Sequence, residues 1–155
     1  MSVTRGLTVL CSTLACIRGA ELVPAEAGPG VEALIADGAV VTAFVESDVP
    51  FYHTNGTVLI PSWSRGTERA FLVLHEVCHA HQWRTHLWGD DWLAGTDEGR
   101  AAAALGMDHE HAADVCALHY LGLTEIPVPS SRREPGYLTG AVPSAWLAWA
   151  RDWLP

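Results

Sequence analysis

The segment "FLVLHEVCHAHQWRTH", residues 71–86, constrains the fold and chemistry of this chain more than any other. Within it, His75-Glu76-Val77-Cys78-His79 has the form H-E-x-x-H. On an α-helix, residues four apart lie about 40° apart around the axis, so both imidazoles can reach one ion. Glu76 is about 100° round from His75, where its carboxylate can hold a metal-bound water without being a ligand. The pattern predicts a helix over residues 67–85 that carries a zinc site with an open coordination position.

A zinc site on this helix needs a third ligand, and the segment "GMDHEHAADVCALHYLG", residues 106–122, supplies candidates. Glu110 and Asp114 stand four residues apart, so both carboxylates share one face of a helix. Glu110 could complete the metal site, and Asp114 could accept the second ring N–H of His75 or His79. Only Glu110 has a second carboxylate at helical spacing, which makes it the expected third ligand. The alternatives are His109, His111 and Asp114.

The combination of H-E-x-x-H with a downstream E-x-x-x-D resembles the gluzincins, the thermolysin-like branch of zinc metallopeptidases. The resemblance covers roughly residues 39 to 121 and implies one Zn²⁺ per chain, with His75, His79 and Glu110 as its ligands. It also implies that Glu76 is the general base and Asp114 the orienting group. The metzincin branch is disfavoured, because residues 80–86 contain no glycine at the bend before a third histidine.

The fold implied by this resemblance is α+β, a minimal zincin-like domain with a small sheet, an active-site H-E-x-x-H helix and a following glutamate helix. At 155 residues, a single domain over residues 1–155 is expected. The remaining patterns predict a helix over 31–37, a strand over 39–47, a type I′ turn at Asn55-Gly56, a strand over 57–62, a helix over 97–121 broken near Gly106, and a closing helix over 144–153. In the closing helix, Trp146, Trp149 and Trp153 form one face that is expected to pack on the core.

Substrate contacts are less well determined by the sequence. The strand over 57–62 could be an edge strand that pairs with an extended peptide, or an interior strand that is fully paired. Tyr137 and His119 are candidate donors to a tetrahedral oxyanion, although a packing tyrosine and a surface histidine are the simpler readings. His53, His81 and His86 are expected at the surface or at the rim of the pocket.

Charge and cysteine content limit the partners and the compartment. The chain has 18 acidic and 9 basic residues and a net charge of −9, which would repel nucleic acid and anionic membrane surfaces. The four cysteines, Cys11, Cys16, Cys78 and Cys116, form no C-x-x-C pair, so reduced thiols in a cytoplasmic protein are expected. Cys78 is expected to be a buried, inert thiol. The N-terminal segment resembles a secretory signal only weakly, and secretion is the alternative.

Three functions fit these residues. The first is a small zinc metallopeptidase that cleaves peptide bonds by Glu-assisted attack of water. The second is a metalloenzyme that acts on a small amide, ester or biosynthetic intermediate, with Trp83, Trp88 and Trp92 walling a closed pocket. The third is a metal-stabilised binding domain without catalysis, against which Glu76 argues, since a structural site needs no carboxylate beside its metal.

Overall fold

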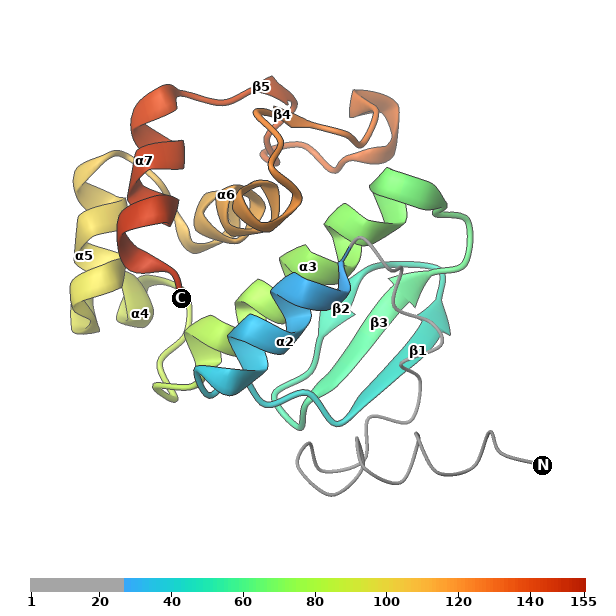
Figure 1. Cartoon of the computed structure of the whole chain (residues 1–155), viewed down its shortest axis with the longest axis horizontal. Coiled ribbons are helices and arrows are strands. Elements are labelled where there is room, and N and C mark those ends of the chain that lie inside the picture. Colours follow the sequence, from blue (N-terminus) through green and yellow to red (C-terminus); the bar gives the residue numbers. More distant parts are fainter. Residues whose placement is uncertain (1–26) are drawn as a thin grey trace.

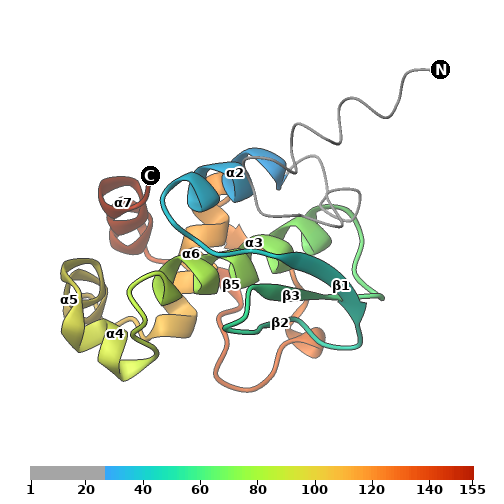
Figure 2. The ribbon, with the colours of Figure 1, turned by 90° about the horizontal axis from the view of Figure 1, so that it is seen from below.

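The computed structural model describes residues 27–155 and shows a mixed arrangement of helices and a small sheet (Figure 1). In chain order the elements are α2 (Gly28–Ala36), β1 (Ala43–Ser47), β2 (Phe51–Tyr52), β3 (Thr57–Pro61), α3 (Gly66–Trp83), α4 (Asp90–Gly95), α5 (Asp97–Ala104), α6 (His109–Leu121), β4 (Glu125–Ile126), the 3₁₀ turn η1 (Ser130–Arg132), β5 (Gly140–Ala141) and α7 (Ser144–Trp153). Helix α3 lies between the sheet and α6 in both views (Figures 1 and 2).

Helix α3 is buried on all sides because the sheet and α6 cover opposite faces of it. Every residue from Ala70 to Gln82 is buried, including His75 and His79. An amphipathic surface helix would show one apolar stripe, whereas a helix in the centre of a domain is apolar nearly all round. The polar groups that α3 does carry must therefore find partners inside the protein.

The three-stranded sheet has the order β1-β3-β2, with β1 parallel and β2 antiparallel to β3. The strand over 57–62 is therefore the central strand, so of the two roles considered for it the paired interior strand is observed and the edge strand open to a peptide is not. Val58 and Ile60 of β3 are fully buried, as expected for a strand that is paired on both sides. The edge strand nearest the predicted site is β2, because Phe51 lines both cavities described below and Tyr52 lines the smaller one.

The hairpin between β2 and β3 forms at the predicted place but with a different turn. Gly56 has φ of +92°, whereas His86 is the non-glycine residue with positive φ in the described part of the chain. A type I′ turn needs positive φ at both central residues, so Asn55-Gly56 does not form one. Instead the Asn55 side chain accepts a hydrogen bond from the Thr57 backbone N–H at 3.0 Å, and Gly56 N–H donates to His53 C=O at 2.8 Å.

The predicted helix over 97–121 is interrupted where expected. Helix α5 ends at Ala104, Gly106 has φ of +80°, and α6 begins at His109. The Asp108 side chain caps α6 by accepting from His111 N–H at 2.7 Å. Gly122, with φ of +65°, ends the helix in a left-handed conformation that glycine adopts at no steric cost.

The aromatic face of α7 packs on the protein only in part. Trp149 is buried with Trp92 in a second hydrophobic cluster, and Trp146 Nε1 donates to Leu105 C=O at 3.0 Å. Trp153, however, is 43% exposed, so the prediction of a fully packed stripe fails at the last turn. None of the helices described in residues 27–155 is both long enough and apolar enough to cross a membrane.

The expectation of reduced thiols is wrong for two of the four cysteines. Cys78 of α3 and Cys116 of α6 form a disulfide, with their Cα atoms 6.2 Å apart. The physical reason is the pairing of the two helices, which brings together residues 38 positions apart in the chain. Cys11 and Cys16 lie outside the described residues.

Candidate metal centre

Three donor atoms from two helices converge on one point. His75 Nε2 and His79 Nε2 are 3.1 Å apart, and Glu110 Oε2 lies 3.2 Å from the first and 3.1 Å from the second. A tetrahedral zinc with bonds of about 2.0–2.1 Å places its ligand atoms about 3.3 Å apart. The triangle of donors is therefore of the size that one zinc ion requires, with Glu110 on α6 facing the two histidines on α3.

Hydrogen bonds behind the two histidines decide which ring nitrogens face the centre of the triangle. His75 Nδ1 lies 2.8 Å from Asp114 Oδ1, and a carboxylate can only accept, so this nitrogen carries a proton. His79 Nδ1 lies 2.9 Å from Gln82 Oε1. In the neutral tautomers, both Nε2 atoms then present lone pairs to each other and to the Glu110 carboxylate. Three lone pairs that face one another favour a cation between them.

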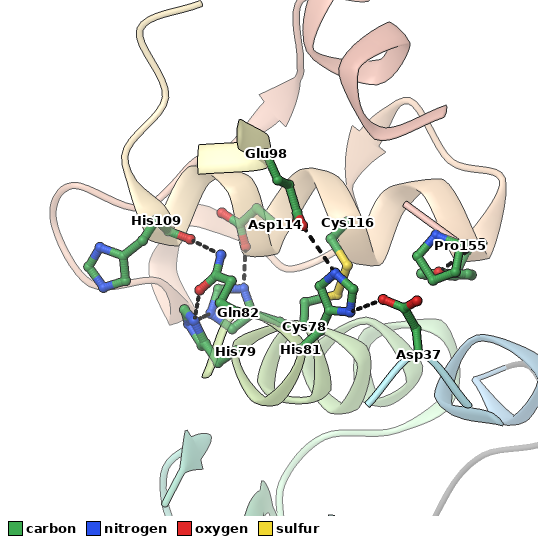
Figure 3. The surroundings of a disulfide bond; sticks show 12 residues. Asp37, Cys78, His79, His81, Gln82, Glu98, His109, Asp114, Cys116 and Pro155 are labelled. Atoms are coloured by element: carbon green, nitrogen blue, oxygen red, sulfur yellow. Dashed lines mark hydrogen bonds and ion pairs between the residues drawn. A yellow bond between two sulfur atoms is a disulfide. The ribbon is translucent and has the colours of Figure 1, made fainter. Parts of the chain in front are cut away.

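Gln82 is held so that its oxygen must face His79. Its amide Nε2 donates to the backbone C=O of His109 at 2.9 Å, which leaves Oε1 for the imidazole (Figure 3). Gln82 was not predicted as part of the site, although its position three residues after His79 on the same helix was a usable signal. The backbone carbonyl of His109, at the start of α6, thus orients the Gln82 amide, and the amide oxygen fixes the tautomer of His79.

Asp114 is completely buried and has a second partner that sequence reasoning also missed. Its Oδ2 forms an ion pair with Arg133, whose side chain is 6% exposed. The Arg133 guanidinium also lies 4.7 Å from the centre of the Tyr137 ring. Arg133 lies in the irregular segment between β4 and β5, where no periodic pattern could have linked it to Asp114.

The protonation of the site follows from these contacts. Burial lowers the pKa of His75, but the carboxylates of Asp114, Glu110 and Glu76 outweigh burial and raise it to about 10. Burial raises the pKa of Glu110, yet hydrogen bonds from His109, His75 and His79 hold it far below its ordinary value. Glu110 is therefore an anion at neutral pH, and the site either keeps a proton among its imidazoles or holds a metal ion in its place.

His109, an alternative considered for the third ligand, lies beside Glu110 and outside the group of three donors. Its Nε2 lies 3.2 Å from Glu110 Oε1, whereas Oε2 is the oxygen that contacts the two histidines. Each oxygen of Glu110 thus has its own partner, and Oε2 is left for the centre of the triangle. The alternative His111 is not among the three donors, and its ring stacks on Trp146 with centroids 5.5 Å apart.

Glu76 lies beside the three donors without joining them. Its Oε1 is 4.0 Å from His75 Nε2, and the side chain is buried. Burial raises the pKa of Glu76, and the neighbouring His75 and His79 lower it less. A carboxylate with a raised pKa at this distance can take a proton from a water held between it and the ligands.

Two cavities open next to Glu76. The larger has a volume of about 640 Å³ and the smaller about 60 Å³, and both are lined by His75, Glu76, Phe51 and Tyr137. Phe51 is 50% exposed, and Val49 and Trp63 at the larger cavity are 55% and 38% exposed, so this cavity opens at the surface. The segment between β4 and β5 also lines the larger cavity, through Arg132, Arg133, Glu134 and Tyr137.

Of the two candidate oxyanion donors, Tyr137 lies beside Glu76 at the cavities, and His119 lies further along α6. Tyr137 lines both cavities, and its ring centroid lies 6.1 Å from that of His75. Burial and the nearby Glu110 and Glu76 raise the pKa of Tyr137, so it keeps its phenolic proton at neutral pH. His119 lies nine residues after Glu110 on α6, about 13.5 Å along the helix axis, and packs against Tyr120.

Some of the remaining histidines and tryptophans lie where they were predicted, and others do not. His53 and His86 are exposed, as expected. His81 is only 1% exposed and lies 3.3 Å from Glu98 Oε2, so its predicted surface position is wrong (Figure 3). Of the tryptophans proposed to close a pocket, Trp88 lines the smaller cavity, whereas Trp92 is fully buried in the second hydrophobic cluster.

No protein-family model, no curated protein and no solved structure matches this chain. Inference about function therefore rests on the residues and the geometry of the site.

Proposed function

We propose that the chain is a zinc-dependent hydrolase, and that it acts as a small metallopeptidase of the gluzincin-like, minimal zincin type. The observation that carries this proposal is the triangle of His75, His79 and Glu110 donors, with Glu76 buried beside it but outside the ligand set. A structural zinc site would have no use for this fourth group. The open cavity next to Glu76 supplies the space that a substrate needs.

The chemistry divides between the ion and the protein. When bound, zinc lowers the pKa of a coordinated water from about 15.7 toward 7 and polarises the substrate carbonyl. Glu76 accepts the proton of the attacking water and later returns it to the leaving nitrogen. Tyr137 donates a hydrogen bond to the oxyanion that develops on the carbonyl. Asp114 and Gln82 keep the two imidazoles in the tautomers that present Nε2.

A peptide substrate is favoured over a small molecule by the shape of the cavity. The larger cavity opens at the surface and is lined by Phe51 of the edge strand β2 and by Pro50 just before it. A free strand edge can pair with an extended main chain. The closed-pocket alternative needed three tryptophans around the site, and the fully buried Trp92 removes one of them. The role first considered for the strand over 57–62 passes in this proposal to β2.

The disulfide also bears on the compartment. Disulfides persist in oxidising environments and are rare in the cytoplasm of most cells. The bond between Cys78 and Cys116 therefore supports the secreted alternative over the cytoplasmic one. Alkylation and mass mapping of the chain, isolated from its native host under acid quench, would show whether this pair is oxidised in the cell.

The test of the reaction is a peptide screen. Zinc-loaded protein is incubated with a diverse peptide library and products are read by mass spectrometry, with Glu76→Gln as the blank. Glu76→Gln keeps the ligands but cannot accept a proton, so cleavage is expected to fall by 10²-fold or more. His119→Ala is the matched control and is expected to cleave like the wild type. Uncut peptides from folded, metal-filled wild type would reject the peptidase.

A further inference from the structure

The helices that carry the donor atoms are also joined covalently. Cys78 is the residue before His79, and Cys116 lies two residues after Asp114. Figure 3 shows the bond crossing between α3 and α6 beside Asp114 and Gln82. The crosslink therefore fixes the position of α6 relative to α3 within two residues of groups that form or orient the site.

The other contacts between the two helices near the site are made by apolar side chains and by polar groups. On α6 the apolar residues next to Asp114 in the main hydrophobic cluster include Ala113 and Ala117, whose small side chains bury little apolar area, and the larger Leu118 lies one turn further on. Around the donor triangle the contacts are polar, and the carboxylates of Glu76, Glu110 and Asp114 gather there. A covalent bond fixes the spacing of α3 and α6 at this point more strictly than such contacts do.

We propose that the Cys78–Cys116 disulfide is a positioning element of the metal site, so that zinc binds with full affinity only after the pair is oxidised. The inference rests on the proposed zinc site. In the crosslinked chain, α6 already holds Glu110 opposite His75 and His79. Metal binding therefore costs less conformational entropy. By thermodynamic reciprocity, bound zinc makes the disulfide harder to reduce by the same factor.

Oxidation is a maturation step rather than a reversible switch. The two thiols lose two protons and two electrons to a disulfide of a small thiol or of a dithiol oxidoreductase, whose S–S bond breaks and which leaves as two thiols. Cys78 is 1% exposed and Cys116 is 2% exposed in the closed protein. Exchange therefore takes place before α3 and α6 close on each other, and the order is oxidation first and tight zinc binding second.

The direct test compares zinc dissociation constants, measured by competition with a chromophoric chelator. Cys78→Ala/Cys116→Ala is expected to bind zinc at least tenfold more weakly than the oxidised wild type, with circular dichroism showing that both are folded. The control is Val115→Ala, which removes buried apolar volume from the other side of α6 and leaves the crosslink intact. It is expected to bind zinc as the wild type does. A loss of less than threefold in the double variant overturns the inference.

A second measurement decides the matter if the double variant does not fold. The full-length wild type is equilibrated in glutathione redox buffers with and without zinc, and the Cys78–Cys116 pair is followed by peptide mass mapping. A tenfold coupling lowers the midpoint potential of this two-electron couple by about 30 mV when zinc is present. An unchanged or raised potential overturns the inference. Equal zinc binding by crosslinked and open chains rejects this inference alone, whereas a wild type that binds no zinc rejects the zinc site as well.

Discussion

Each proposed histidine ligand has a different hydrogen-bond acceptor behind it. His75 meets the carboxylate of Asp114, and His79 meets the amide oxygen of Gln82. Replacing Gln82 with alanine frees His79 to rotate and to exchange tautomers, so zinc affinity is expected to fall 10- to 100-fold. Gln82→Glu keeps an acceptor at this position and should lose much less. Competition titrations measure both, and equal affinities for wild type and Gln82→Ala would show that the amide does not orient the ligand.

The raised pKa of His75 predicts a pH dependence of stability in the metal-free protein. The pKa rises from 6.5 to about 10 on folding, so protonation stabilises the folded state fully below pH 6.5. The raised pKa of Glu76 acts with the same sign from pH 4.5 upward, and the contribution of His75 is lost as pH rises from 6.5 toward 10. Urea titrations should show the free energy of unfolding falling over this range without metal. Zinc takes the place of the proton, so the loaded protein should show a smaller fall; the same slope with and without zinc would contradict this reading.

At the scale of elements, α6 presents Glu110 from its first turn, and that turn depends on Asp108. The Asp108 carboxylate accepts from His111 N–H and caps the helix two residues before Glu110. Asp108→Ala is expected to lower the free energy of unfolding by about 1 kcal/mol, and Asp108→Asn, which can still cap, by much less. Urea denaturation of the three proteins checks this. Equal losses for alanine and asparagine would mean that charge, not the cap, matters.

The elements that the sequence predicts well are those with local signals. The helix around His75 and the break near Gly106 follow from periodicity and glycine chemistry within a few residues. The central place of β3 could not be predicted, because strand order depends on pairing partners that the strand itself does not encode. Arg133 and the disulfide were missed for a related reason, since each joins segments that only the packed fold brings together.

At the scale of the whole molecule, the disulfide closes a long loop that includes α4, α5 and most of α6. The bonded residues are 38 positions apart. Loop-closure entropy for that separation corresponds to about 4 kcal/mol of stability at 25 °C. Cys78→Ala/Cys116→Ala should lose a comparable amount in urea denaturation of the metal-free protein. A loss below about 1 kcal/mol would mean that residual contacts in the unfolded chain already restrict this loop when the disulfide is absent.

The most direct test of the zinc site is the metal content of three purified proteins after loading with zinc and removal of the excess. Elemental analysis should find one zinc per chain in the wild type and one in His119→Ala, which changes a histidine of α6 far from the donor triangle. His79→Ala removes one of the three donor atoms and should retain almost none. A wild type without zinc, or a His79→Ala variant that keeps a full equivalent, would contradict the assignment of His75, His79 and Glu110 as a metal site.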